Sequence, residues 1–472
     1  MKSLAIIFVF ITTNAVAGPL TIGPDYKRPA TDAPARYKAE EMGQWKEGQP
    51  IDHLPKGSWW EIFGDAELNA LEAQALTANQ ELKAAFATVN QARASARIAR
   101  ADFFPTLSLD PRFSRDRFSA NQEPYFGSIT ANTFHVPLDL SYEIDLWGRV
   151  RRGFESARAE AAASTAAFQN VLLTLQADVA QNYFSLRATD LELATIQRTV
   201  ELRVEQLTIV SNRFESGLGA ELDVARAATE VAATEAELAG LTRRRVELEN
   251  ALAILTGQQP SGFKIPPRTT LNEPVAIPPG LPSALLERRP DIAEAERQLA
   301  ADNARIGVAK AAFFPVLRLT GSGGFLSAEA ENLFQWDSRV WSIGPSLSLP
   351  IFAGGRNRAG YQRAQARFEE SVARYRQRVL VAFGEVENSL AAVRLLASQS
   401  AAQERAVTSA RAAREMALES FNAGIIRYLD VIDADRVALQ NERLRAQIAG
   451  QRLISTVQLI KALGGGWNIE NL

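Results

Sequence analysis

The sequence contains no cysteine and only two histidines, His53 and His135. Without cysteine the chain can form no disulfide, thiolate metal site or cysteine nucleophile. With two histidines we expect no histidine-built metal site or catalytic triad, and each is interpreted as a surface or packing residue. We therefore predict no catalytic residue, no metal site and no cofactor, and the expected protein is not an enzyme.

Neither sign of charge is in excess, because 52 basic residues face 54 acidic ones. This balance favours neither a nucleic-acid partner nor a polybasic membrane patch. The apolar run Leu4–Ile11 follows Lys2 and precedes the small residues of 15–17, a pattern that predicts a secretory signal peptide over 1–17. No later run reaches the roughly 20 apolar residues that a membrane-spanning helix needs. The exported chain should be soluble, or enter a membrane only as a closed β-barrel.

Proline is missing from two long intervals. All 21 prolines lie outside the 122 residues between Pro137 and Pro260 and the 122 residues after Pro350. Since proline breaks helix interiors, these intervals allow long helices. In the first interval apolar residues recur every seven positions, as in a left-handed coiled coil. These residues are Leu186, Leu193, Val200, Leu207 and Phe214.

The long helices should form two hairpins, each turning at a glycine. Gly217 and Gly424 stand where the seven-residue patterns stop, and glycine is the usual left-handed residue after a helix. The first descending helix would be about 100 Å long at 1.5 Å per residue. We expect hairpin helices over 149–214, 221–255, 357–421 and 428–463, and shorter helices over 66–101 and 284–311.

The chain is a tandem duplication. "FFPTLSLD" at Phe103 returns as "FFPVLRLT" at Phe313, 210 positions later. "RFESGLGAELDV", which ends at Val224, returns as "SFNAGIIRYLDV", which ends at Val431, 207 positions later. Two such echoes in the same order indicate an internal repeat, which has to be recognised before a fold is assigned.

Alternating polarity predicts two strands in each repeat, over about 104–114, 134–147, 315–325 and 340–351. From Leu138 to Leu146 every second residue is apolar, while Asp139, Glu143 and Asp145 lie among the residues between. A soluble sheet with one wet face would give the same pattern. We favour transmembrane strands, because the neighbouring helices carry coiled-coil seams and aromatic residues gather at the strand ends.

Four strands cannot close a membrane barrel, since the smallest such barrels have about eight. Two copies would give eight strands and a barrel filled by its own side chains. Three copies would give twelve strands around a pore. We therefore predict a mainly α-helical homotrimer, in which a twelve-stranded transmembrane β-barrel stands on a barrel of coiled-coil helices.

Four long motifs resemble the TolC-like outer-membrane efflux channel family, and most closely its OprM/NodT branch. They are "WWEIFGDAELNALEAQAL" from Trp59, "YEIDLWGRVRR" from Tyr142, "LLERRPDIAEAERQLAADNARIGVAKAAFFPVLRL" from Leu285 and "LPIFAGGRNRA" from Leu349. The resemblance implies a trimeric exit duct in the outer membrane of a Gram-negative bacterium. It also implies a periplasmic adaptor (a membrane fusion protein) and an inner-membrane transporter, most often of the proton-driven RND type, as partners.

The resemblance also divides the chain and leaves one departure. The branch is usually lipidated on a cysteine shortly before the "GPDY" motif, which begins here at Gly23, and this chain has no cysteine. A lipid anchor is therefore predicted absent. The expected segments are the signal peptide 1–17, an equatorial segment 18–65, a first repeat 66–258 with its tip at about 214–221, a Pro-rich equatorial linker 259–283, a second repeat 284–464 with its tip at about 421–428, and a tail 465–472.

The hairpin tips are the predicted gate. Asp430 and Asp433 lie three residues apart at the start of a helix, so three copies would form two rings of carboxylates. The matching family positions line the periplasmic constriction, and the resemblance carries that role to both residues. The alternative is that acids in a first helical turn simply complement the helix dipole.

The tips should also interact with one another and with the adaptor. Phe421 stands where the family has a tyrosine, and Ile426 where it has an arginine, so we hypothesise that Arg427 or Arg213 pairs with Asp223. The apolar residues Leu218, Ile425 and Ile426 follow the turn glycines and are predicted to form a docking surface. Local packing within each hairpin is the alternative.

Two further expectations concern the lumen and competing functions. Asp139, Glu143 and Asp145 would make the barrel lumen acidic and cation-attracting, an effect that Arg112 and Arg318 temper. The competing functions are an exit duct for type I protein secretion, which would share the fold, and a soluble periplasmic coiled-coil adaptor, which would need only one hairpin. "GSGG" at Gly321 is a weak match to a phosphate loop, because it lies within a predicted strand.

Overall fold

The computed structural model describes residues 21–29, 57–121, 128–274 and 289–465. The predicted signal peptide and nearly all of the predicted tail lie outside these residues. The chain divides into two compact units, which are described separately. The first contains residues 1–29, 91–162 and 296–373, and the second contains residues 30–90, 163–295 and 374–472.

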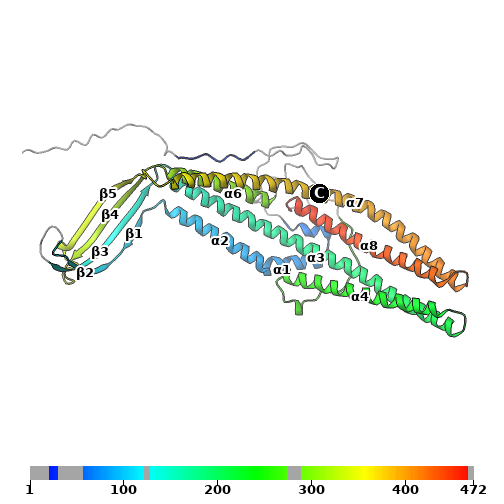
Figure 1. Ribbon diagram of the computed structural model, residues 1–472. Helices are drawn as coiled ribbons and strands as arrows, with labels where there is room; N and C mark the ends of the chain where they lie inside the picture. Colours follow the sequence, from blue (N-terminus) through cyan, green and yellow to red (C-terminus); the bar gives the residue numbers. More distant parts are fainter. Residues whose placement is uncertain (1–20, 30–56, 122–127, 275–288, 466–472) are drawn as a thin grey trace, which may run out of the picture. The chain divides into compact units, whose positions relative to one another are not determined.

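The first unit contains one antiparallel sheet (Figure 1). Its strands are β1 (Thr106–Leu109), β2 (Arg112–Phe118), β3 (Ile129–Ile144), β4 (Val316–Ser327) and β5 (Arg339–Ser348). Their order is β1-β3-β4-β5, and β2 also pairs with β3. The strand predicted over 104–114 is thus divided in two: Asp110 donates to the carbonyl of Pro137 at 3.4 Å, but Pro137 has no N–H to donate in return. β3 joins the first repeat to β4 of the second.

The sheet keeps one register throughout, so its two faces differ in polarity over most of its length. In one row Leu107 pairs with Leu140, Leu140 with Gly321, and Gly321 with Ile343. In the next row Ser108, Asp139, Ser322 and Ser342 are aligned in the same way. We call these the apolar face and the polar face. The apolar face is uncovered within the chain, since the side chain of Trp341 is 79% exposed and that of Ile343 is 70% exposed.

The described chain contains seven α-helices, and all but the first have a counterpart of identical length in the other repeat. They are α1 (Ala66–Ala78), α2 (Gln80–Ala101), α3 (Arg149–Glu215), α4 (Glu221–Leu255), α6 (Pro290–Ala311), α7 (Arg356–Asn422) and α8 (Tyr428–Ala462). α3 and α7 each have 67 residues, and α4 and α8 each have 35. No helix of the described chain combines the length and the apolar character required to span a bilayer.

Two predicted helices differ from the structure at one place each. The helix expected over 66–101 is divided at Asn79, whose side-chain oxygen accepts a hydrogen bond from the backbone N–H of Leu82 at 2.8 Å. The Asn79 amide also donates to the carbonyl of Leu255 at 2.9 Å, which ties this break to the end of α4. The helix expected from Ala284 begins at Pro290 in the structure, and proline is favoured in a first helical turn. Residues 284–288 lie outside the described part.

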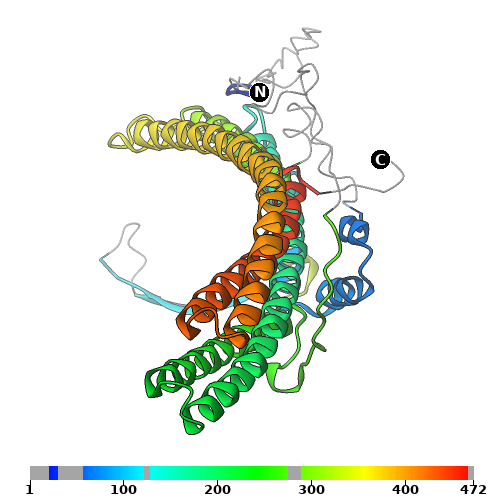
Figure 2. The same ribbon diagram turned by 90° about the vertical axis from the view of Figure 1, so that its right-hand side faces the viewer.

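The second unit has its main core where a short 3₁₀ helix, Trp59–Phe63, packs with α1, α3, α4 and α8. Trp59, Tyr183 and Leu186 are fully buried there. The Trp59 indole N–H donates to the side-chain oxygen of Gln176 at 3.1 Å, so its polar atom is satisfied. In both views α3 lies beside α4 and α7 beside α8, which gives the two expected hairpins (Figure 2).

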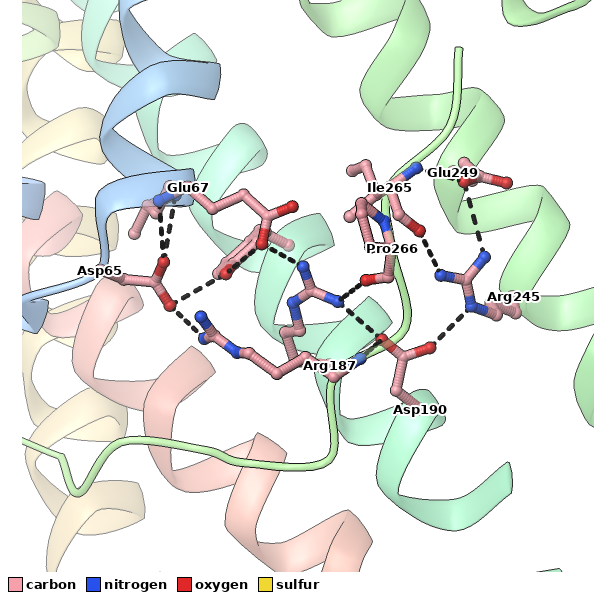
Figure 3. A network of polar contacts seen from close by, with 11 residues as sticks. Asp65, Glu67, Arg187, Asp190, Arg245, Glu249, Ile265 and Pro266 are labelled. Carbon is pink, nitrogen blue, oxygen red and sulfur yellow. Dashed lines mark hydrogen bonds and ion pairs between the residues drawn. The ribbon is translucent and has the colours of Figure 1, made fainter. Parts of the chain in front are cut away.

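A polar network attaches the segment after α4 to α3 (Figure 3). The side chain of Arg187 on α3 is 1% exposed, and it donates to Asp190 at 2.8 Å and to the carbonyl of Pro266 at 2.7 Å. Arg245 on α4 donates to Asp190 at 2.6 Å and to the carbonyl of Ile265 at 2.6 Å. A buried guanidinium without such partners would destabilise the fold strongly.

The same network attaches the start of α1. Arg187 also pairs with Glu67, and the Tyr183 hydroxyl donates to Asp65 at 2.9 Å. Burial would raise the pKa of the Asp65 carboxyl, but hydrogen bonds from Arg268 and Tyr183 outweigh it and hold this pKa below its ordinary value. Asp65 therefore stays ionised, and it also caps α1 by accepting from the backbone N–H of Glu67 at 3.1 Å.

The crossing of α8 and α3 depends on a glycine. A Cβ atom at Gly450 would lie 2.5 Å from the Cβ of Ala188, closer than two carbon atoms can approach. Gly450→Ala should therefore lower stability by about 1–3 kcal/mol. Gly240→Ala in α4 meets no atom within 4 Å and should raise stability by about 0.5–1 kcal/mol. Thermal unfolding of both variants in detergent checks this, and equal midpoints for the two would contradict it.

Candidate functional site at the hairpin turns

The two hairpins turn in the same way. Gly217 and Gly424 have φ angles of 72° and 77°, in the left-handed region that favours glycine. In the first turn the Gly217 and Leu218 N–H groups donate to Phe214 and Arg213 carbonyls at 2.9 and 2.8 Å. Gly424 and Ile425 make the equivalent bonds, both at 2.9 Å, in the second turn. These are Schellman motifs, which satisfy the last carbonyls of α3 and α7.

Two of the three predicted docking residues are exposed. The side chains of Leu218 and Ile425, each directly after its turn glycine, are 75% and 76% exposed. Ile426 is instead partly buried against an apolar cluster beneath the turns. For Ile426 the structure therefore shows local packing rather than an exposed docking side chain. Leu218 and Ile425 occupy equivalent places in the two repeats.

The apolar cluster beneath the turns joins both hairpins. Its buried members are Val210, Ala227, Tyr428, Val431 and Ile432, from α3, α4 and α8. Phe421 of α7 packs against it, with its ring centroid 5.4 Å from that of Tyr428. Burial raises the pKa of the Tyr428 phenol to about 12, so this tyrosine remains neutral. The tips are therefore fixed to one another within a single chain.

Asp430 and Asp433 are both exposed on α8. The Asp430 carboxylate accepts a hydrogen bond from the backbone N–H of Arg427 at 3.1 Å, and the Arg427 side chain lies 4.0 Å away. Asp430 thus caps the start of α8, as the alternative interpretation requires. Asp433 makes no ion pair with any residue that the structure describes. Because they are three residues apart, the two carboxylates lie on one side of α8.

The hypothesised pair with Asp223 is not formed among the described residues of one chain. Asp223 instead pairs with Arg226, one turn further along α4, at 3.4 Å. Arg213 lies over the ring of Phe421 with 4.6 Å to the centroid, and it donates to the Phe421 carbonyl at 3.3 Å. Arg213 therefore links the first hairpin to the second. Within one chain Asp223 therefore pairs with the arginine one helical turn away, and Arg213 contacts the second hairpin instead.

A buried charge cluster above the turns was missed by the sequence analysis. Arg203 on α3 pairs with Asp435 on α8 at 2.9 Å and with Glu230 on α4 at 3.0 Å, and all three are buried. Arg436 of α8 also pairs with Glu230. A signal was present: Arg203 lies seven residues after Ile196, so it occupies a position of the otherwise apolar coiled-coil seam. A charge there requires buried partners of opposite sign.

The predicted lumen acids are largely neutralised. Glu143 accepts from Arg149 at 2.7 and 2.8 Å, and Asp145 accepts from Arg151 at 3.1 Å. Arg318, which was expected to temper these acids, also lies 3.8 Å from Glu143. The acidic field expected along the polar face is therefore weakened at its helix-proximal end, and Asp139 is left between Ser108 and Ser322.

The comparisons with known sequences agree with one another. The chain matches the model of the family "Outer membrane efflux protein" over residues 71–258 and 281–465. The solvent efflux pump outer membrane protein SrpC of Pseudomonas putida is 36% identical, over 96% of this chain and 97% of SrpC. Outer membrane protein OprJ of Pseudomonas aeruginosa is 37% identical, over 96% and 94%. The cation efflux system protein CusC of Escherichia coli K12 is 31% identical, over 97% and 98%.

Solved structures show the same likeness. The outer-membrane channel OprN superimposes with a TM-score of 0.87 at 32% identity, over 94% of this chain and 99% of that chain. The open state of the Neisseria gonorrhoeae outer membrane channel MtrE superimposes with a TM-score of 0.81 at 30% identity, over 94% and 98%. These neighbours confirm the predicted fold class.

The buried cluster gives a stability prediction. Asp435→Ala leaves Arg203 without its closest partner and should cost about 3–5 kcal/mol, while the double variant Arg203→Met/Asp435→Leu should lose much less. Asp433→Ala, two residues away and exposed, should change stability by less than about 0.5 kcal/mol. Denaturant unfolding of the wild type, these three variants and the single variant Arg203→Met measures the coupling. A double variant as unstable as the sum of Asp435→Ala and Arg203→Met would refute the buried pair.

Proposed function

We infer that the chain, which belongs to the outer membrane efflux protein family, is the exit duct of a tripartite efflux pump in the outer membrane of a Gram-negative bacterium. The main support for this function is that one chain contains both a sheet with an apolar and a polar face and two coiled-coil hairpins of equal length. Relatives such as SrpC and CusC are named as efflux components, which favours efflux over protein secretion. The partners are a periplasmic adaptor and an inner-membrane transporter, and we propose the RND type for the transporter.

We propose that three copies close the sheet into a twelve-stranded barrel embedded in the lipid of the outer membrane. In the described chain β5 pairs only with β4, and β1 and β2 pair only with β3, so both edges of the sheet are free. Free edges of this length require a partner strand. β1 and β2 follow one another along the same side of β3 and together act as one strand of the wall. If the purified protein in detergent has the mass of one or two chains, the proposed trimer is contradicted.

We place the gate at the hairpin turns. In a trimer the exposed carboxylates of Asp430 and Asp433 would form two rings at the narrow end of the helical barrel. The negative charge of these rings would attract cations. We propose that Asp223 pairs with Arg213 or Arg427 of a neighbouring copy. The exposed side chain of Arg427 is available for such a contact.

The gate predicts a change of ion selectivity. Asp430→Asn/Asp433→Asn removes both charges but keeps an oxygen that can cap α8, so the fold should be retained. Single channels in planar bilayers should show a lower cation-to-anion permeability ratio than wild type. Asp223→Ala should enlarge the conductance steps by loosening the contact between tips.

A matched control for the gate is Glu415→Gln/Glu419→Gln, which removes two exposed carboxylates from α7 of the same hairpin. Its selectivity should stay at the wild-type value. Equal effects of the two double variants would show a general loss of charge and remove the gate assignment. If the wild type forms channels but neither double variant changes the permeability ratio, the protein is still a duct, and the acidic gate is rejected.

We propose that Leu218 and Ile425, at the turn residues Gly217 and Gly424, contact the adaptor. Leu218→Glu/Ile425→Glu should abolish dye efflux in cells, because a charge in an apolar contact is costly, while the conductance of the purified channel stays unchanged. Ile254→Glu, at a side chain 65% exposed near the end of α4, is the control and should retain efflux. Normal efflux by the double variant would exclude this surface.

A further inference from the structure

The apolar face of the sheet carries no charge along most of its length. Its positions in the paired strands are Leu107, Leu109, Phe113, Phe134, Val136, Leu138, Leu140, Tyr142, Ile144, Leu317, Leu319, Gly321, Gly323, Phe325, Trp341, Ile343, Pro345 and Leu347. Charged residues appear on this face only at the end of the sheet that lies away from the helices. This order, apolar first and charged last, is that of a surface crossing from hydrocarbon to headgroups.

Three arginines occupy that end of the apolar face. Arg115 and Arg117 pair with Asn132 and Thr130 and alternate with the polar-face residues of β2. Arg339 begins β5 and pairs with Phe325. At about 3.4 Å per residue, Arg115 lies about 7 Å beyond Phe113 along the strand, and Arg117 about 14 Å beyond it.

Aromatic rings lie between Arg115 and the aliphatic part of the face, whereas Arg339 lies in the row of Val136, one row nearer the helices. The rings of Phe113 and Phe134 lie 4.6 Å apart across the β2–β3 pair. Arg339 lies over the ring of Trp336, which is itself 75% exposed. Aromatic side chains concentrate at the level where a membrane barrel leaves the hydrocarbon. Arg115 and Arg117 therefore lie at headgroup level when the apolar face contacts lipid.

No acid of the described chain forms an ion pair with Arg115, Arg117 or Arg339. Asp116 lies between the first two, but it points to the polar face and accepts a hydrogen bond from Ser114 at 2.7 Å. The side chains of Arg115 and Arg117 are exposed and thus available to an anion outside the chain, whereas the Arg339 Nε–H already donates to the carbonyl of Trp336 at 2.7 Å. Guanidinium binds phosphate oxygens with two parallel hydrogen bonds, which makes phosphate its best-matched partner at a lipid surface.

We propose that Arg115 and Arg117 bind the phosphate groups of the outer-leaflet glycolipid around the barrel. The inference rests on the proposed orientation, with the hairpins in the periplasm and the β2–β3 end outside. A ring of three such clusters in a trimer would fix the height of the barrel in the membrane. It would also order the lipid nearest to the wall.

The test compares two faces of one strand. Purified wild type, Arg115→Gln/Arg117→Gln and Arg112→Gln are titrated in dodecyl maltoside with bisphosphorylated lipid A, and bound lipid is counted by native mass spectrometry. Arg112 is the matched control, because it lies on the same strand but on the polar face opposite His135. We expect the double variant to bind at least about tenfold more weakly, since each arginine makes a charge-assisted hydrogen bond. The control should remain within about twofold of wild type.

Several results would overturn the proposal. These are undiminished binding by the double variant, an equal loss in Arg112→Gln, and equal binding of dephosphorylated lipid A. Competition by millimolar inorganic phosphate would indicate a site for the free ion rather than for the headgroup. Conductance is recorded for all three proteins: unchanged channels with unchanged lipid binding would reject the lipid site and keep the duct, whereas absence of channels in wild type would reject the duct itself.

Discussion

Two arginines buried on α3 fix the arrangement of the helical unit. Arg187 forms ion pairs with Glu67 and Asp190 and donates to a carbonyl of the segment after α4. Arg203 forms ion pairs with Glu230 and Asp435. A coiled-coil seam rich in alanine and leucine can slide by one seven-residue repeat with little loss of apolar contact. A buried charge cannot slide, because any shift would leave it without its partners. The registers of α1, α4 and α8 against α3 are therefore set by charge.

This register decides what the turns present to their surroundings. Because α3 and α7 have 67 residues each, and the returning helices 35 each, the two turns reach equivalent positions. The shared apolar cluster and the contact of Arg213 with Phe421 then hold the tips together. The side chains of Leu218 and Ile425 are left 75% and 76% exposed. The proposed docking surface and the proposed gate thus lie at one place because one hairpin is duplicated.

Much of the fold could be predicted from periodicity. The helix expected over 149–214 ends one residue later in the structure, and the alternation of the strands matches both faces of the sheet. Periodicity could not show the break at Asn79, which depends on a hydrogen bond to Leu255 far along the chain. It also missed the pairing of Glu143 with Arg149. The contact of Glu143 with Arg149 lies where β3 is followed by α3, and neither the strand alternation nor the seven-residue helix repeat extends across that boundary.

The double role of Asp430 is consistent with a gate. One oxygen of its carboxylate accepts the Arg427 N–H, and the side chain is still 46% exposed. The positive end of the α8 dipole stabilises a negative charge in this first turn. Three such carboxylates facing one another would repel, and the helix dipoles oppose that repulsion. The proposed ring would therefore combine a local cap on α8 with a field that acts on ions at the narrow end of the duct.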